Sequence, residues 1–308
     1  MVDDRGPASV RTFPRFPAFR GLRLEDREAV TGALVADPPA ISDLTFACLR
    51  MWKRSAPIEV STLDGALILV ARPQCGPPYA LPPVSAERPA EVARTVLETL
   101  CAVEGGAFRL RFVPEPLAMT LASSGLRITE ERSAADYVYR TRDLIDLPGK
   151  RYDAKRNWIR RCLASHACEY EPVASGNVAE CVAFTEEWCK DRPCDEDPVL
   201  CGEIAAIREA FACWDDLGLV GGVVRVDGRA SAYAVGEPLS PTTGVVHFEK
   251  ADPRVPGLYQ LVNNRFCAAA MAEFEFVNRE EDMGNPGIRK AKMSYHPVRL
   301  VRKYAIGL

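Results

Sequence analysis

The chain has 308 residues, of which 47% are hydrophobic and 26% are charged. This composition is ordinary for a globular protein and favours two modest domains over one large domain. The formal net charge of -3 excludes a globally basic nucleic-acid-binding protein, although it leaves room for a local basic patch.

The sequence carries no sign of membrane insertion or export. No run approaches the roughly 18 consecutive apolar residues of a membrane span, and residues 1–16 lack the apolar core of a signal peptide. We therefore expect a cytoplasmic protein. The eleven cysteines are odd in number and stand singly in apolar stretches, which indicates reduced, buried thiols. Cys189, Cys194 and Cys201 lack the paired spacing of a zinc site, so no metal is expected.

Helices open the first half of the chain, after an expected tail over residues 1–20. Apolar spacing predicts helices over 24–36 and 41–53. The turn Asp64-Gly65 predicts a hairpin, because this dipeptide suits the left-handed turn between twisted strands. The following pattern predicts a helix over 87–101, a strand over 108–113, a short helix over 116–123 and extended chain from residue 126.

The second half repeats this order of elements. Helices are predicted over 177–190 and 198–216, then a hairpin with its turn at Asp227-Gly228, a strand over 244–248, a helix over 257–272 and a strand over 274–277. The two hairpin turns lie 163 positions apart, at residues 64 and 227, and Phe108 and Phe274 lie 166 apart. A constant offset indicates a tandem duplication joined near residues 146–149. We predict an N-terminal domain over 21–147 and a C-terminal domain over 148–308 that carries the active site.

The order of elements in each half resembles the GNAT acyltransferase fold. In that fold two central parallel strands splay apart, and the acyl donor enters the gap. The resemblance implies an α/β (α+β) protein with tandem GNAT-like domains, in which mixed sheets are flanked by helices.

Charged side chains are concentrated in residues 278–297. The segment begins where an apolar strand ends and continues into a helix that Pro286-Gly287 opens. Carboxylates at the carboxyl end of a strand, beside a helix with lysines and arginines, form a charged cluster where open α/β sheets bind ligands. The alternative is a solvated loop with surface ion pairs.

The chain resembles the phosphatidylglycerol lysyltransferase C-terminal domain family along nearly its whole length. The matching pieces are residues 39–46 with Met51-Trp52, residues 143–152, 155–157 and 247–252, and the 278–297 stretch. In this family and in the related Fem peptidyltransferases the donor is an aminoacyl-tRNA, and the acceptor is a lipid, a cell-wall peptide or a small metabolite. Membrane-bound members carry a multi-span segment ahead of this domain that this chain lacks, which counts against a lipid acceptor.

A basic segment near the midpoint fits a tRNA donor. If 152–164 is a helix, its basic side chains form a ridge that could neutralise phosphates of the acceptor stem. The alternative is a solvated helix that links the two halves. Trp158, Ile159, Cys162 and Leu163 would be its buried side, and Arg156, Asn157 and Arg160 would face away. The residues assigned to tRNA binding are Lys150, Arg151, Lys155, Arg156 and Arg160.

The second hypothesis is an acyltransferase that uses acyl-CoA as its donor. CoA-dependent GNAT proteins grip the pyrophosphate with a glycine-rich turn at a helix amino end, and the equivalent place here is residues 254–259. Tyr259 replaces a small residue there, so backbone amides could not approach a pyrophosphate as closely. No cofactor is therefore expected. The third hypothesis is a protein that binds a metabolite or RNA without catalysis.

Aminoacyl transfer from a charged tRNA requires orientation of the ester, proton removal from the nucleophile and stabilisation of the oxyanion. We assign these tasks to the charged cluster and expect it on the same rim as the basic ridge. His247 could act as a base or simply pack in the core. The candidate catalytic residues are Glu249, Lys250, Glu280, Glu281, Asp282 and Lys290, and the candidate substrate-binding residues are His247, Tyr259, Asn278, Arg289, Lys292 and Tyr295.

Overall fold

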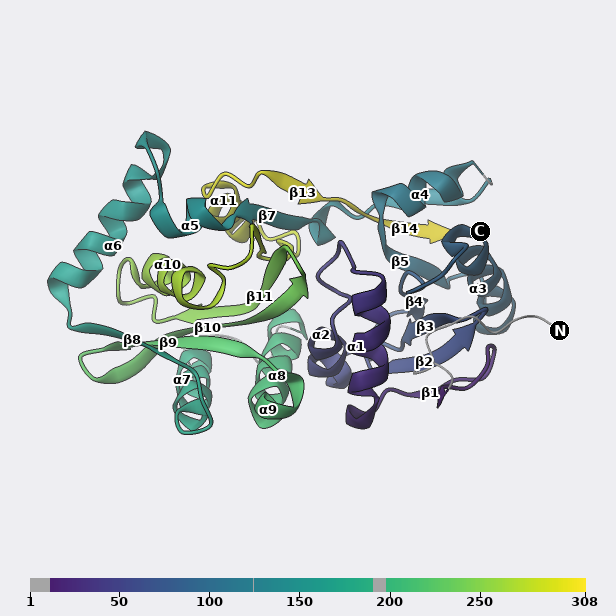
Figure 1. Cartoon of the computed structure of the whole chain (residues 1–308), viewed down its shortest axis with the longest axis horizontal. Helices are drawn as coiled ribbons and strands as arrows, with labels where there is room; N and C mark the ends of the chain where they lie inside the picture. The colour runs from purple at the N-terminus through teal and green to yellow at the C-terminus, as the bar shows by residue number, and fades with distance from the viewer. Residues whose placement is uncertain (1–11, 124, 191–197) are drawn as a thin grey trace. The chain divides into compact units, whose positions relative to one another are not determined.

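Two seven-stranded mixed sheets, each flanked by helices, organise the chain in the computed structural model, which describes residues 12–123, 125–190 and 198–308 (Figure 1). The chain divides into two compact units. Unit 1 consists of Met1–Asp136, Glu281–Gly284 and Val301–Leu308. Unit 2 consists of Tyr137–Glu280 and Asn285–Leu300.

The sheet of unit 1 has the strand order β1-β2-β3-β4-β5-β14-β6. Its parallel pair, β4 and β5, is in register at Tyr79 with Arg109 and at Ala80 with Leu110. Val96 and Leu97 of α3 and Ile68 of β3 are buried together in the hydrophobic core of this unit. The strands are β1 Arg20–Gly21, β2 Ile58–Leu63, β3 Ala66–Ala71, β4 Tyr79–Ala80, β5 Arg109–Pro114, β6 Arg127–Glu130 and β14 Lys303–Gly307. The helices are η2 Leu24–Asp26, α1 Arg27–Ala36, α2 Phe46–Met51, η3 Trp52–Arg54, α3 Pro89–Glu104, α4 Glu115–Ala122 and η4 Arg132–Ala134.

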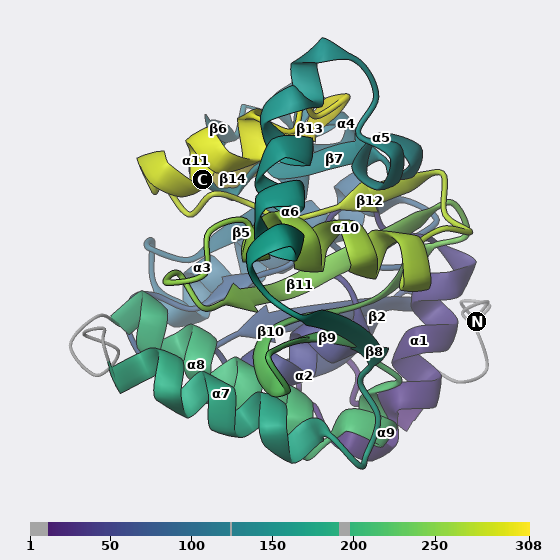
Figure 2. The same cartoon turned by 90° about the vertical axis from the view of Figure 1, so that its left-hand side faces the viewer.

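The sheet of unit 2 has the order β13-β7-β12-β11-β10-β9-β8. Helix α10 covers one face of this sheet, and α7 and α8 cover the other (Figure 2). The strands are β7 Asp136–Arg140, β8 Cys168–Pro172, β9 Val220–Val226, β10 Arg229–Ser240, β11 Thr243–Ala251, β12 Phe276–Asn278 and β13 Arg299–Val301. The helices are α5 Thr141–Asp146, η5 Lys150–Tyr152, α6 Asp153–Ser165, α7 Val178–Lys190, α8 Pro198–Ala212, α9 Trp214–Leu217, α10 Leu258–Ala270 and α11 Pro286–Met293.

The parallel strands β11 and β12 pair over only three positions, and the last pair is Val245 with Asn278. Beyond this pair β11 continues to Ala251, whereas β12 ends at Asn278. The two strands therefore part at this point, and side chains from later in both segments meet across the gap. This is the splayed pair of a GNAT-like sheet, and the prediction of tandem GNAT-like halves with mixed sheets is confirmed.

The two repeats exchange one strand. In unit 1 the position between β5 and β6 is taken by β14, from the end of the chain, and in unit 2 the position between β12 and β13 is taken by β7. The first residues of the two strands, Asp136 and Lys303, lie 167 positions apart, close to the offset of the repeat. Each repeat thus supplies a strand to the sheet of the other.

A buried ion pair lies at the start of both exchanged strands. Lys303 Nζ lies 2.6 Å from Asp136 Oδ1 and 2.5 Å from Asp43 Oδ2. Ser42 donates its backbone N–H and its hydroxyl to the Asp136 carboxylate, each over 2.9 Å. Burial lowers the pKa of Lys303, but the Asp136 and Asp43 carboxylates outweigh it and hold that pKa well above its usual value. Lys303 is therefore a charged, fully buried anchor of β14.

The strand exchange also sets the limits of the units. The sequence predicts a join near residues 146–149 and a second domain over 148–308. The compact units divide between Asp136 and Tyr137, and they return residues 281–284 and 301–308 to unit 1. The cause is that β14 pairs with β5 and β6.

Most predicted elements match the structure, with two local differences. The helix expected over 41–53 begins at Phe46, because the Thr45 side chain caps it by accepting the N–H of Cys48 over 3.0 Å. The helix expected over 198–216 is broken at Cys213 into α8 and α9. Within the described ranges, no helix is long and apolar enough to cross a membrane.

Candidate functional site in unit 2

A β-bulge places His247 at the centre of a polar cluster. On β10, Val235 pairs with Phe248 and Gly236 pairs with Val246, so His247 is the extra residue on β11. Gly236 allows this close approach, because a Cβ at that position would lie 2.1 Å from the Val245 carbonyl oxygen. Bulges commonly re-aim a side chain beside a functional site, and this one directs the imidazole to two glutamates.

His247 lies between the carboxylates of Glu237 and Glu280. Nδ1 is 2.7 Å from Glu280 Oε1, and Nε2 is 2.9 Å from Glu237 Oε1. Both ring nitrogens face carboxylate acceptors, so both donate only if the ring is protonated. Burial lowers the pKa of His247, but the hydrogen bonds to Glu237 and Glu280 outweigh it and raise the pKa to about 10. The imidazole is thus a fixed positive charge at neutral pH and cannot serve as a base.

A second cluster, which we name the splay cluster, bridges the gap between β11 and β12. It consists of Glu249 on β11, Asn263 on α10 and Arg279, the first residue after β12. Arg279 Nη2 donates to both oxygens of Glu249, each over 3.1 Å. Asn263 Nδ2 donates to Glu249 Oε2 over 3.0 Å. The cluster therefore lies where the two parallel strands have separated.

Aromatic side chains wall the splay cluster. The Arg279 guanidinium carbon lies 4.9 Å from the ring centre of Tyr295 and 5.7 Å from that of Tyr139. Lys155 of α6 lies 4.1 Å from the Tyr295 ring centre and donates to Ser294 Oγ over 2.6 Å. Burial, and then the charge of Arg279, lower the pKa of Lys155 to about 8. A substantial fraction of this half-buried amine is therefore neutral near physiological pH.

The candidate catalytic residues occupy different places in the two units. Glu249 lies in the splay cluster and Glu280 beside His247, as the preceding contacts show. Lys250 is buried away from both clusters: its Nζ is 2.6 Å from Glu203 of α8 and 4.3 Å from the Trp188 ring centre. Lys290 is exposed on α11. Contacts assign Glu281 and Asp282 to unit 1.

Asp282 illustrates why these two acids do not join the clusters of unit 2. Its carboxylate is fully buried, forms an ion pair with Arg132 over 3.2 Å and accepts the N–H of Gly284 over 2.9 Å. The backbone turns at Glu280, which has a positive φ of 56°, and this separates Glu280 in unit 2 from Glu281 and Asp282 in unit 1. Through its two contacts, the Asp282 side chain stabilises the loop in unit 1.

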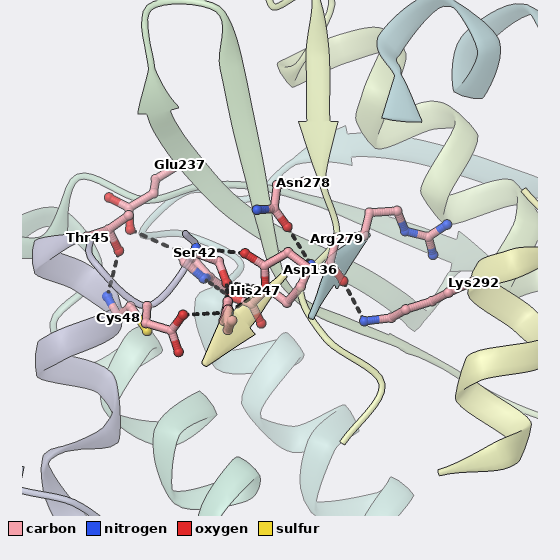
Figure 3. A network of polar contacts seen from close by, with 12 residues as sticks. Ser42, Thr45, Cys48, Asp136, Glu237, His247, Asn278, Arg279 and Lys292 are labelled. Atoms are coloured by element: carbon pink, nitrogen blue, oxygen red, sulfur yellow. Dashed lines mark hydrogen bonds and ion pairs between the residues drawn. The ribbon is translucent and has the colours of Figure 1, made fainter. Parts of the chain in front are cut away.

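The candidate substrate-binding residues mostly support the two clusters. Asn278 is fully buried and accepts the N–H of Glu280 over 2.8 Å. Lys292 donates to the carbonyl oxygen of Arg279 over 2.5 Å (Figure 3). Tyr295 is a wall of the splay cluster, Tyr259 packs against the core of unit 2, and Arg289 is half-buried on α11.

The expected basic ridge is only partly an exposed surface. Lys150, Arg151 and Arg160 are exposed, whereas Lys155 turns to Tyr295. Arg156 donates to the carbonyl oxygen of Gly149 over 3.0 Å and contacts that of Leu147. The prediction that Trp158 and Leu163 are buried is wrong: they are 39% and 40% exposed. Only Cys162 of that face is fully buried, and Ile159 is partly buried against the core of unit 2.

Sequence reasoning did not select Asn263, Arg279 or Glu237 as site residues. Asn263 had a detectable signal, because it is a polar residue on the apolar face of the helix over 257–272. Arg279 lies within the charged stretch but gives no separate signal. Glu237 is brought to His247 by the bulge, which leaves no mark in the sequence pattern.

The cysteine pattern lies partly outside the described residues, since Cys194 falls in 191–197. Among the residues that the structure describes, no cluster of His, Cys, Asp and Glu side chains could hold a metal ion.

The chain is similar to a known protein family over most of its length. The model of the family "Phosphatidylglycerol lysyltransferase, C-terminal" matches residues 38–307. The chain belongs to this family. No curated protein matches it. A conserved protein of unknown function from Bacteroides thetaiotaomicron is 31% identical, with a TM-score of 0.88 over 94% of this chain and 99% of that chain.

Two other solved structures share the fold at lower identity. L-PGS from Bacillus licheniformis is 14% identical, with a TM-score of 0.63 over 91% of each chain. FemX is 9% identical, with a TM-score of 0.59 over 94% of this chain and 97% of that chain. Membership of the family points to an acyltransferase.

Proposed function

We propose that the chain is an aminoacyltransferase that moves an amino acid from an aminoacyl-tRNA to a small-molecule, peptide or lipid acceptor. The observation that carries this proposal is the splay cluster, in which charged and aromatic side chains fill the gap between β11 and β12. This gap is the place where a GNAT-like sheet receives its acyl donor. Membership of the lysyltransferase family favours an aminoacyl group as the donor.

The proposed reaction forms a bond between an acceptor amine or hydroxyl and the carbonyl carbon of the aminoacyl ester. The ester bond to the ribose of the tRNA then breaks, and the ribose oxygen leaves with a proton. The Arg279 guanidinium would stabilise the negative charge that develops on the carbonyl oxygen. Lys155, with its pKa near 8, would accept the proton of the nucleophile and pass it to the leaving ribose oxygen. His247 would act as a positioning residue that fixes Glu280.

The packing of α6 on the amino end of α10 supports a tRNA donor over CoA. In CoA-dependent GNAT proteins, the pyrophosphate binds at this helix end. Here a Cβ at Gly257 would lie 2.2 Å from the Trp158 carbonyl oxygen and 3.2 Å from Cys162 Cβ. Helix α6 thus covers the backbone amides that would otherwise face a pyrophosphate.

Exposed side chains of α6 suit an unpaired RNA end. Trp158 is 39% exposed, and the Arg161 guanidinium lies 4.8 Å from its ring centre. Exposed aromatic rings and arginines stack on unpaired bases, which is how proteins commonly hold single-stranded RNA. We propose that this surface, with Lys150 and Arg160, contacts the acceptor end of the tRNA.

A donor test separates this function from the two alternatives. The purified chain is incubated with a mixed pool of charged tRNAs and candidate acceptors, while tRNA deacylation is followed on acid gels and products by mass spectrometry. We expect accelerated loss of one charged species with formation of an aminoacylated product. Acetyl-CoA binding in calorimetry without any effect on charged tRNA would favour the CoA-dependent enzyme, and failure with both donors would favour a non-catalytic binding protein.

A further inference from the structure

A cavity lies in unit 1 where the parallel strands β4 and β5 part. The two strands pair at only two positions, the second of which joins Ala80 and Leu110. Strand β4 ends there, whereas β5 continues to Pro114. The cavity has a volume of about 580 Å³, and its lining includes Pro83, which follows β4, and Pro114, which ends β5. Cavities of roughly 300–1,000 Å³ commonly hold small molecules.

Prolines form much of the cavity wall. Seven of the 17 described residues that line it are prolines. Proline has no backbone N–H, so these positions offer a ligand no hydrogen-bond donor. Ile41, Leu44 and Val84 add buried aliphatic side chains to the lining. A strongly polar ligand would lose its hydrogen bonds to water here without replacement, whereas an aromatic ring packs well on proline rings. The wall therefore suits a flat apolar group.

The amino end of α3 borders the cavity but is poorly equipped to bind an anion. In CoA-dependent GNAT proteins, the backbone N–H groups of this helix end hold the pyrophosphate. Here the first helical position is Pro89, which has no N–H. The side chain of Arg88, at the N-cap, donates to Glu91 over 2.6 Å. These features count against a phosphate or a nucleotide as the ligand.

The charges of the lining favour a cation instead. Among the described residues of the lining, the charged ones are Asp37, Arg88 and Glu91. Because Arg88 forms an ion pair with Glu91, the net charge that remains is the negative charge of Asp37. The Asp37 carboxylate accepts the N–H of Ser85 over 2.9 Å, which leaves lone pairs for a further donor. Asp37 is also the C-cap of α1, where the last carbonyl groups of the helix add partial negative charge.

We propose that this cavity binds a small arylalkylamine, with its ring on the proline walls and its ammonium group at Asp37. The ring requires no hydrogen-bond donor, and the ammonium group donates to the carboxylate. The site lies within unit 1 and requires neither tRNA nor the splay cluster. It therefore goes beyond the proposed function and does not depend on it.

The test measures by calorimetry how the full-length chain binds three probes that share an indole ring and a two-carbon linker. Tryptamine ends in a positive ammonium group, tryptophol in a neutral hydroxyl and indole-3-propionate in a negative carboxylate. We expect tryptamine to bind about fivefold more tightly than tryptophol, because water screens the charge of the exposed Asp37 side chain and limits the gain. Indole-3-propionate should bind most weakly. No binding of any probe, or equal affinity for tryptamine and tryptophol, would overturn the proposal.

Two variants test the position of the site. Asp37→Asn removes the charge but keeps an oxygen for the Ser85 N–H, so it should abolish the preference for tryptamine and leave tryptophol binding unchanged. Thr120→Trp places a large side chain in the lining and should block all three probes. Met119→Trp, at an exposed neighbouring position of α4 outside the lining, is the control and should bind them normally. A tryptamine preference that survives in Asp37→Asn, or undiminished binding by Thr120→Trp, would also overturn the proposal. If a variant does not fold, the three-probe comparison on the unmodified chain still decides.

Discussion

His247 holds a positive charge where little water reaches it. The charge is tolerated because both ring N–H groups meet glutamate oxygens, which compensates for the loss of hydration. A buried ion triad of this kind fixes Glu280 at its unusual backbone angle. The charged His247 side chain thus holds the carboxylates of Glu237 and Glu280 in place.

The charge of His247 gives folding stability a specific pH dependence. The pKa is raised from 6.5 to about 10 by the fold, so the folded protein binds the proton more tightly than the unfolded chain. The contribution is complete below the unfolded pKa of about 6.5 and is lost as the pH rises through about 10.

His247→Gln should lower the free energy of unfolding by about 3 kcal/mol or more at pH 6, because the carboxylates of Glu237 and Glu280 lose the positive charge that lies between them. The difference from the unmodified chain should shrink at pH values above 10. Chemical denaturation at several pH values measures this, and His296→Gln, at an exposed position, is the control. A difference that stays constant from pH 6 to pH 11 would contradict the charged state of His247.

The exchanged strands β7 and β14 decide whether one half of the chain can fold without the other. Neither β7 nor β14 lies in the sheet built from the rest of its own repeat, so cutting the chain near residue 148 would leave each half without a strand next to its parallel pair. The ion pair between Lys303 and Asp136 secures both strands where they begin. We therefore expect the chain to require both repeats in order to fold.

Lys303→Met tests the strand anchor. It should destabilise the protein by about 3–5 kcal/mol, because Asp136 would remain buried without its positive partner. Arg302→Met is the matched control on the neighbouring residue, since its ion pairs with Glu115 and Glu130 are surface contacts, which are screened by water and contribute little to stability. Equal losses for the two variants in chemical denaturation would show that the ion pair contributes no more than a surface contact.

Local patterns predicted the elements well, and long-range pairing limited the rest. The Asp-Gly hairpins and the constant offset sufficed for the repeated fold, because they depend on neighbouring residues. The exchange of β7 and β14 could not be predicted, since either repeat offers a strand of the same length and character. The sequence also grouped Glu280 with Asp282, because they are close along the chain. The backbone is left-handed at Glu280, and the two residues belong to different units.

The whole molecule is slightly acidic, with a formal net charge of -3, so any contact with tRNA must be local. The exposed cations around α6 are the candidates, whereas Lys155 and Arg156 are engaged in contacts within unit 2. Replacing Lys150, Arg160 and Arg161 together by Ala should weaken tRNA binding and reduce the salt slope by about 0.7–0.9 for each lost phosphate contact. Filter binding at several salt concentrations measures this. The control replaces two exposed arginines of unit 1, Arg88 at the N-cap of α3 and Arg94 on that helix, by Ala. An equal change in salt slope for each lost cation would reject α6 as the tRNA surface.

The rate of aminoacyl transfer by Arg279→Lys tests most directly whether the chemistry takes place at the splay cluster. With the charged tRNA that the donor test identifies, kcat/KM for product formation is measured for the unmodified chain, Arg279→Lys and the control Arg265→Lys, at an exposed position of α10. We predict a loss of about 100-fold or more for Arg279→Lys, which is typical of removing one oxyanion donor, and an unchanged rate for Arg265→Lys. A folded Arg279→Lys variant that transfers as fast as the unmodified chain would contradict this account.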